Sequence, residues 1–306
     1  MVYNDIRELI GNTPILKLNN LGISKNVSLY AKLEFLNPGG SVKDRIGVSM
    51  IEKAEKDGRL KPGGTIVEAT AGNTGIGIAL AAINKGYRVI FTVPEKFSVE
   101  KIVIMEALGA TVINTPKESG MEGAISKART MLEEIPDAIS LLQFENPANP
   151  EVHHDHTGKE IYNALEGDID YFVVGAGSGG TMTGVSKYLK SKKSSIQTIV
   201  ADPVGSTMGG GEAGCYQIEG IGNHFIPDTM AMALVDDFIK ITDKEALYYV
   251  RELAIKEGLI VGTSSGAAVA AAVKLAKRID KGNIVTLLPD RGERYFSKNI
   301  FKLEAL

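Results

Sequence analysis

Short apolar runs alternate with helical stretches along most of the 306 residues of the chain. The runs are rich in β-branched residues, which favour strands, and apolar residues recur at helical spacing between them. This alternation predicts an α/β fold with two open, twisted, mostly parallel sheets and helices on both faces of each. The expected strands are 27–33, 65–69, 88–93, 110–115, 140–144, 171–175, 197–201 and 283–289, and the expected helices are 42–57, 75–85, 99–108, 121–135, 157–165, 180–191, 243–257 and 265–279.

The length of the chain favours two domains, because so long a chain can bury more than one core. The segment PANPEVHHDH, residues 147–156, breaks the alternation and is expected to cross between domains. The block 45–147 has the size of a complete small sheet domain. We therefore expect a smaller α/β domain at 45–147 and a larger one formed by 1–44 plus 148–306.

The charge of the chain is nearly balanced, with 34 basic and 37 acidic residues and a net charge of −3. No basic patch stands out, which argues against nucleic acid or a membrane surface as the main partner. The N-terminal segment MVYNDIRELI lacks the apolar core of a signal peptide. A single cysteine, Cys215, cannot form an intrachain disulfide, so a cytoplasmic location is expected.

Three polar, glycine-rich turns come at the starts of expected helices: EATAGNTGIG at 68–77, GAGSGGTMTG at 175–184 and GTSSG at 262–266. In open α/β sheets such turns gather at the carboxyl edge, where ligands bind. The first offers the side-chain donors of Thr70, Asn73 and Thr74 beside glycine amides. Both of the first two turns suit anions, although each could also be only a tight connection.

The second turn suits a phosphate, because its backbone N–H groups and the following helix N-terminus would face an anion. An alternative interpretation is a dinucleotide site, since Gly175, Gly177 and Gly180 form GxGxxG after a strand and the next strand ends near Asp202. The double glycine followed by a threonine favours a compact single phosphate. The residues of this candidate phosphate loop are Gly177, Ser178, Gly179, Gly180 and Thr181.

Lys43 stands in LEFLNPGGSVKDRIG, just after a Pro-Gly-Gly turn and at the start of an expected helix. Ser41 and Asp44 have the spacing of a capping box. An ammonium group is disfavoured at a helix N-terminus, so Lys43 is either a tolerated surface lysine or a neutral amine that does covalent work. Two anion cradles, one such lysine and the lack of a metal motif suggest a phosphorylated cofactor with a carboxylate substrate. The cluster HHDH at 153–156 is interpreted as a solvated segment, with metal binding as the alternative.

The motifs NPGGSVKDR, EATAGNTGIG, QFENPANP, GAGSGGT, IEGIG and GTSSGAA occur in that order along the chain. This ordered set resembles the pyridoxal-phosphate β-replacement enzymes, the cysteine synthase and cystathionine β-synthase family of fold type II. The resemblance extends from residues 10–18 to 291–298, nearly the full length. It implies pyridoxal 5'-phosphate as cofactor, a homodimer, and a smaller domain that moves onto the substrate.

The resemblance also implies a role for each candidate residue. Lys43 would hold the cofactor as a Schiff base and then remove the α-proton of the substrate. Asn73 would bind the cofactor's ring oxygen, the loop 177–181 its phosphate, and Ser264 its pyridine nitrogen. The residues expected around the substrate and its α-carboxylate are Thr70, Ala71, Gly72, Asn73, Thr74, Gln143 and Gly220, the last in a loop that closes on the substrate. The roles of Asp228 and Asp290 stay open.

The implied reaction replaces the β-substituent of O-acetylserine, serine or cysteine by sulfide or a thiol. Cysteine synthases usually carry serine where this chain has Ala71, so we expect a looser acceptor pocket. The alternatives are a cystathionine synthase, a lanthionine-forming enzyme that releases hydrogen sulfide, a related dehydratase, and a catalytically silent binding homologue.

Overall fold

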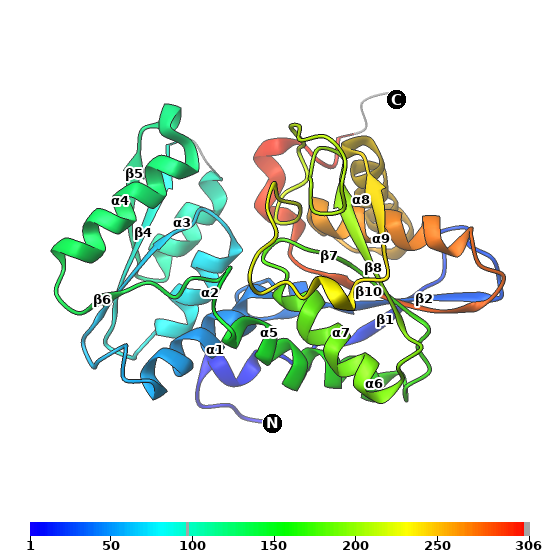
Figure 1. The fold of residues 1–306 in the computed structure, drawn as a ribbon, viewed down its shortest axis with the longest axis horizontal. Helices are drawn as coiled ribbons and strands as arrows, with labels where there is room; N and C mark the ends of the chain where they lie inside the picture. Colours follow the sequence, from blue (N-terminus) through cyan, green and yellow to red (C-terminus); the bar gives the residue numbers. More distant parts are fainter. Residues whose placement is uncertain (96–97, 303–306) are drawn as a thin grey trace. The chain divides into compact units, whose positions relative to one another are not determined.

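The computed structural model describes residues 1–95 and 98–302, and it confirms the predicted α/β class with two mostly parallel sheets (Figure 1). The chain divides into two compact units, which are described separately below. Unit 1 consists of Met1–Ile10 and Asn37–Asn149, and unit 2 of Gly11–Leu36 and Pro150–Leu306. These boundaries fall at 10/11, 36/37 and 149/150, whereas the sequence suggested 44/45 and 147/148.

Unit 1 is built on a four-stranded parallel sheet in the order β5-β4-β3-β6. The helix α4 packs on β3, β4 and β5, while α2 contacts β4 and packs closely on α1. The chain runs from β3 to β4 and β5 on one side and returns to β6 on the other, so the loops after β3 and β6 emerge side by side. Such a switch point is where open α/β sheets bind ligands. The elements of unit 1 are β3 (Thr65–Ala69), β4 (Arg88–Pro94), β5 (Thr111–Thr115), β6 (Ala138–Ile139), α1 (Lys43–Lys56), α2 (Asn73–Ala82), α3 (Val99–Ala107) and α4 (Gly120–Glu134), with 3-10 turns η1 (Ile6–Leu9) and η3 (Lys117–Ser119).

Unit 2 is built on a six-stranded sheet in the order β1-β2-β10-β7-β8-β9, in which only the β1–β2 pair is antiparallel. Alternate side chains of β7, β8 and β10 enter two separate apolar clusters, because successive residues of a strand face opposite sides. One cluster includes α8 and α9, and the other includes α6 and α7. The elements of unit 2 are β1 (Ile15–Leu18), β2 (Val27–Leu33), β7 (Tyr171–Gly175), β8 (Gln197–Pro203), β9 (Asp237–Ile241), β10 (Gly282–Leu288), α6 (Lys159–Ala164), α7 (Gly180–Lys192), α8 (Asp243–Glu257) and α9 (Thr263–Ala276), with η2 (Glu34–Leu36), the π-helix η4 (His153–Gly158), η5 (Met232–Leu234) and η6 (Gly292–Lys298).

Most predicted elements are confirmed to within a few residues, but the expected strand at 140–144 is wrong. The strand β6 ends at Ile139, and Leu142 adopts a left-handed backbone conformation with φ of 54° that no strand can continue through. The segment 147–156, where the sequence suggested a domain crossing, contains the unit boundary at 149/150 and is helical, as α5 (Ala148–Val152) followed by η4. The short strands β1 and β9 were not predicted.

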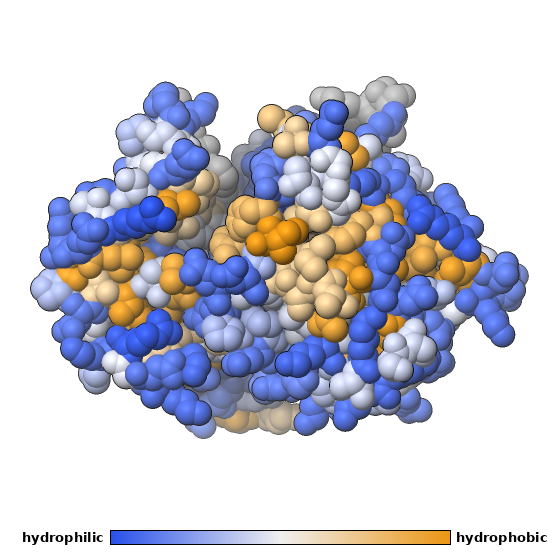
Figure 2. All heavy atoms as spheres, in the orientation of Figure 1, coloured by the Kyte–Doolittle hydropathy of each residue, from blue (hydrophilic) through white to orange (hydrophobic). Residues whose placement is uncertain are grey.

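Within residues 1–95 and 98–302, no helix is long and apolar enough to cross a membrane. The alanine-rich helix α9 is a buried core element, as expected, since its residues from Ala267 to Val273 are at most 2% exposed. Figure 2 shows a group of apolar side chains on the drawn face of unit 2, surrounded by hydrophilic ones. Exposed apolar side chains are normal on protein surfaces, so this group alone indicates no partner.

Candidate active site

Lys43 is the first residue of α1, directly after the turn formed by the Pro-Gly-Gly segment. The hydroxyl of Ser41 accepts a hydrogen bond from the Lys43 amide at 3.2 Å. The predicted capping box is wrong: Val42 occupies the N-cap position, and the Asp44 carboxylate accepts from the Gly39 amide at 2.6 Å. Asp44 therefore fixes the turn that leads into the lysine, rather than closing a box with Ser41.

The helices α1 and α2 approach each other at two glycines. A Cβ atom added to Gly47 would fall within 3.0 Å of the Gly77 backbone, and one added to Gly77 within 3.0 Å of the Lys43 carbonyl oxygen. Only glycine permits this approach, because any side chain would separate the two backbones. The contact brings the start of α1, with Lys43, to the first turns of α2, which carry Asn73 and Thr74.

The loop after β3 and the loop after β6 meet through their side chains. The Thr74 hydroxyl donates to the Gln143 side-chain oxygen at 2.7 Å, and the Gly72 amide donates to the Thr70 hydroxyl at 3.3 Å. Thr70, Ala71 and Thr74 are buried, whereas Gly72 and Asn73 are half-buried at the start of α2. Helix N-termini and amide groups favour anions, so this arrangement suits a carboxylate.

The candidate phosphate loop joins β7 to α7 in unit 2. The carbonyl oxygens of Ala176, Gly177 and Ser178 accept hydrogen bonds from the Gly222 amide, the Asn223 side chain and the Thr229 hydroxyl respectively. Because these carbonyls are turned toward the segment 220–230, the amide groups of the loop and of the first turn of α7 are directed elsewhere, as an anion cradle requires.

Two glycines make this packing possible. Gly179 has φ of 80°, which favours glycine, and a Cβ atom on it would fall within 3.0 Å of Met230. A Cβ atom on Gly177 would fall within 3.0 Å of the Gly220 carbonyl oxygen. The structure thus brings Gly220 to the candidate phosphate loop.

His153 contacts the same loop, which the sequence interpretation of a solvated segment missed. Its side chain is fully buried, with Nδ1 at 2.9 Å from the Thr157 hydroxyl and Nε2 at 3.1 Å from the Thr181 hydroxyl. The spacing of His153 and Thr157 on one helical face was visible in the sequence, but the contact with Thr181 depends on tertiary structure. His154 is different, since it pairs with Asp155 near the surface.

Ser264 lies in the first turn of α9 and is 4% exposed. The neighbouring Thr263 hydroxyl accepts a hydrogen bond from the Glu219 amide at 3.0 Å, so the segment before Gly220 is tied to the start of α9. Asp290 was left open by the sequence, and it is buried against Gly262, where its carboxyl accepts from the Tyr295 hydroxyl at 2.5 Å. Asp228, by contrast, is exposed.

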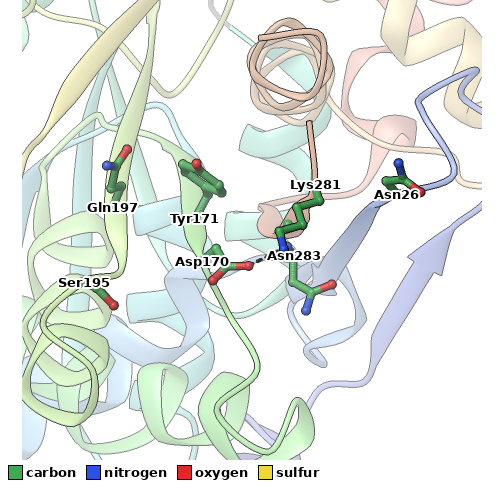
Figure 3. A pocket seen from close by; sticks show the side chains of 8 residues that line it. Asn26, Asp170, Tyr171, Ser195, Gln197, Lys281 and Asn283 are labelled. Atoms are coloured by element: carbon green, nitrogen blue, oxygen red, sulfur yellow. Dashed lines mark hydrogen bonds between the residues drawn. The ribbon is translucent and has the colours of Figure 1, made fainter. Parts of the chain in front are cut away.

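A pocket of about 500 Å³ opens at the edge of the unit 2 sheet where the parallel strands begin, opposite the edge that carries the candidate phosphate loop (Figure 3). Tyr171, Gln197 and Gly282, which line it, are the first residues of β7, β8 and β10. The Asp170 carboxylate in its wall accepts from the Asn283 amide at 2.9 Å. The pocket therefore lies at the amino ends of the parallel strands and contains none of the candidate site residues.

The fold and these groups of residues are those of an α/β enzyme with a lysine at a helix start, a candidate carboxylate-binding loop and a candidate phosphate cradle. The residues fit pyridoxal phosphate. The carbonyl oxygens of residues 176–178 are hydrogen-bonded to the segment 220–230, which leaves the loop amides directed where they could bind a phosphate. The chain belongs to the family described as pyridoxal-phosphate dependent enzymes, whose family model matches residues 6–290.

Individual relatives match over nearly the full length. The chain is 50% identical over 302 residues to an O-acetylserine dependent cystathionine beta-synthase of Bacillus subtilis, covering 98% of both chains. It is 48% identical to a cysteine synthase of Helicobacter pylori, covering 98% of this chain and 99% of that one. A solved O-acetylserine dependent cystathionine beta-synthase from Helicobacter pylori has a TM-score of 0.94 at 47% identity, covering 99% of this chain and 100% of that one. The predicted family, cofactor and enzyme class are thereby confirmed.

The dinucleotide alternative is not supported. Asp202, its expected ribose-binding acid, is 1% exposed and forms an ion pair with Lys240 at 2.6 Å. The same carboxylate accepts from the Gly209 amide at 3.0 Å.

In the part of the chain that the structure describes, no cluster of three or more acidic, histidine or cysteine side chains is arranged to hold a metal ion.

Proposed function

We propose that this enzyme replaces the β-substituent of O-acetylserine and accepts both sulfide and the thiol of an amino acid such as homocysteine. The observation that carries the proposal is Ala71, a buried residue in the loop that bears the candidate carboxylate-binding groups. A methyl group there leaves more room than the serine expected in a strict cysteine synthase. The names of the similar proteins, which include both activities, support the same breadth.

The chain's residues take the following roles in this proposal. Pyridoxal phosphate supplies an aldehyde that reacts with amines and an electron sink for the substrate's α-carbon. Lys43 would hold the aldehyde and would later move the proton at the α-carbon, which its place at the start of α1 supports. Thr74 and Gln143 orient the α-carboxylate, and the loop 177–181 holds the phosphate. Ser264 would face the pyridine nitrogen as a neutral group.

A product analysis with paired donors and acceptors tests the function. O-acetylserine, serine and cysteine would each be combined with sulfide, cysteine and homocysteine, and the products would be separated and quantified. We expect turnover of O-acetylserine with sulfide and with homocysteine. Turnover with sulfide alone, with both amino-acid thiols excluded equally, contradicts the proposal of a broad acceptor pocket.

The assignment of Lys43 is tested by borohydride reduction and peptide mapping of the holoenzyme. The cofactor label is expected on the peptide that contains Lys43, and Lys43→Ala should lose covalent attachment while keeping its fold. Lys53→Ala is a matched control, since Lys53 lies on the same helix and pairs with Asp57 at 3.0 Å. A label on any other lysine would refute the assignment.

We also infer a homodimer in the cytoplasm. The single cysteine supports a reducing location, and the family resemblance supports the dimer. Sedimentation equilibrium of the holoenzyme measures the mass of the assembly directly.

A further inference from the structure

Glu68, on strand β3 of unit 1, binds the turn that precedes Gln143. One of its carboxylate oxygens, Oε1, accepts hydrogen bonds from the Ser140 hydroxyl at 2.9 Å, from the Leu142 amide at 3.1 Å and from the Leu141 amide. Three donors on one oxygen make this side chain the main link between β3 and the segment after β6. Glu68 has no role among the residues of the proposed function.

The side chain of Glu68 accepts hydrogen bonds from the residues that follow the end of the β3–β6 ladder. The strands β3 and β6 pair only at Thr65 with Ala138 and at Ile66 with Ile139. Beyond Ile139 the backbone turns away, so the amides of the next residues cannot continue the ladder. The carboxylate supplies the acceptor that a strand would have supplied, and it does so two residues before Thr70, where the carboxylate-binding loop begins.

The turn held in this way is strained. Leu142 has φ of 54°, a left-handed conformation that is unfavourable for residues other than glycine. Its side chain is 49% exposed, so burial offsets little of this cost. Asn146 also supports the turn, since its amide donates to the Leu142 carbonyl at 2.9 Å and its side chain to the Leu141 carbonyl at 2.8 Å. Removing the Glu68 acceptor would favour relaxation of Leu142.

The next residue in the chain is Gln143, so the turn sets its position. Its backbone carbonyl accepts from the Asn149 side chain at 2.8 Å, and its side-chain oxygen accepts from Thr74 at 2.7 Å. A shift of the turn would therefore separate Gln143 from Thr74. Misplacement of binding groups by about 1 Å is enough to lower activity by roughly two orders of magnitude.

We propose that Glu68 is a positioning residue for the α-carboxylate of the substrate: by holding residues 140–142, it sets where Gln143 meets the loop at 70–74. The proposal rests on the proposed function, because it assumes that this loop binds a substrate carboxylate. The length of the Glu68 side chain matters more than its charge, since its oxygen accepts hydrogen bonds from uncharged amides and a hydroxyl. Burial raises the pKa of Glu68 above its usual range, which agrees with a role that does not need the charge.

Two substitutions separate the effect of side-chain length from the effect of charge at Glu68. Glu68→Gln keeps the length and an acceptor oxygen but removes the charge, while Glu68→Asp keeps the charge but withdraws the acceptor by one methylene group. In holoenzyme, the binding of L-alanine, which has no β-leaving group, would be compared with that of ethylamine, its analogue without the carboxylate. Titrations followed by cofactor absorbance give both dissociation constants.

We expect Glu68→Asp to weaken alanine binding about tenfold with little change for ethylamine, which corresponds to about 1.4 kcal/mol. Glu68→Gln should stay within about threefold of the wild type, as expected for an exchange of acceptors. In turnover, Glu68→Asp should raise KM for O-acetylserine more than it lowers kcat. Glu55→Asp is the matched control: Glu55 accepts from Lys85 and Tyr87 elsewhere in unit 1, so its change should affect stability alone.

The outcomes separate the inference from the function on which it rests. A wild-type enzyme that binds alanine no better than ethylamine would count against the carboxylate site itself. If the wild type prefers alanine and Glu68→Asp keeps that preference, or if Glu68→Gln loses it, the positioning role is overturned. Should Glu68→Asp fail to fold, Glu68→Ala is compared with the unchanged Glu68 in a Leu142→Gly background, which relieves the strain of the turn. An alanine preference about tenfold lower without the acceptor supports the proposal, and an equal preference overturns it.

Discussion

Gly77 lies against the carbonyl group of Lys43, so close that a Cβ atom on Gly77 would fall within 3.0 Å of that carbonyl oxygen. The contact joins the helix that carries the candidate Schiff-base lysine to the helix that follows the candidate carboxylate-binding loop. The position of Lys43 relative to Asn73 and Thr74 therefore depends on the absence of one methyl group.

Gly77→Ala is expected to force α1 and α2 apart. Overpacking of this kind typically costs about 1–3 kcal/mol of the free energy of unfolding. The rate of turnover should also fall, even under conditions where the variant is fully folded. Urea unfolding and steady-state turnover measure the two effects. In Gly214→Ala, the control, the nearest atom lies 3.6 Å from the added Cβ, so both quantities should stay near the wild type. Equal behaviour of the two variants would contradict the role of the contact.

Gly177→Ala is expected to weaken cofactor binding, because its Cβ atom would fall within 3.0 Å of the Gly220 carbonyl oxygen. Relief of the clash must move the loop 177–181 or the segment that covers it. We expect a cofactor dissociation constant about tenfold higher, equivalent to about 1.4 kcal/mol. Fluorescence titration of the apoenzyme measures it, with circular dichroism to verify the fold. Unchanged affinity would show that this loop does not hold the phosphate.

Tyr295→Phe is expected to alter the pH dependence of stability. Burial and then the neighbouring Asp290 carboxyl raise the pKa of Tyr295 well above its ordinary value of 10.0. The folded protein thus holds the phenol proton more tightly than the unfolded chain does. The resulting contribution to the free energy of unfolding is complete below the unfolded pKa and is lost as the pH rises through the folded one.

Two results should follow for Tyr295→Phe. At pH 8 the variant should be less stable by about 1–3 kcal/mol, because the buried Asp290 carboxyl loses a donor. Above pH 10.0 its stability should fall less steeply with pH than that of the wild type. Urea unfolding at several pH values measures both, and Tyr248→Phe, at an exposed position, is the control. Parallel pH profiles for wild type and Tyr295→Phe would contradict the assignment.

Ala71→Ser is expected to narrow acceptor use. The added hydroxyl fills part of a buried site, so homocysteine should lose kcat/KM relative to sulfide by about tenfold, within the range for one group in a pocket. The ratio of the two kcat/KM values, measured with O-acetylserine as donor, is the readout. An unchanged ratio would mean that Ala71 does not set acceptor size.

Spacing along the chain alone did not decide which capping boxes form. Thr242 and Glu245, three residues apart at the start of α8, form a capping box in the structure. The capping box of Ser41 and Asp44 is absent although the spacing is the same, since the Asp44 carboxylate binds the Gly39 amide instead. A competing donor in the preceding turn therefore decides which of these local contacts the Asp44 carboxylate makes.

The sequence by itself determined the fold class, the family and the places where Lys43, the glycine-rich loops and Ser264 enter their helices. These follow from local periodicity and from motifs that each lie in one short segment. Only the tertiary structure decided that His153 is buried beside Thr181 and that Glu68 holds the turn before Gln143. Those partners lie 28 and 73 residues apart, and side chains so distant meet only when helices and strands pack around a common core.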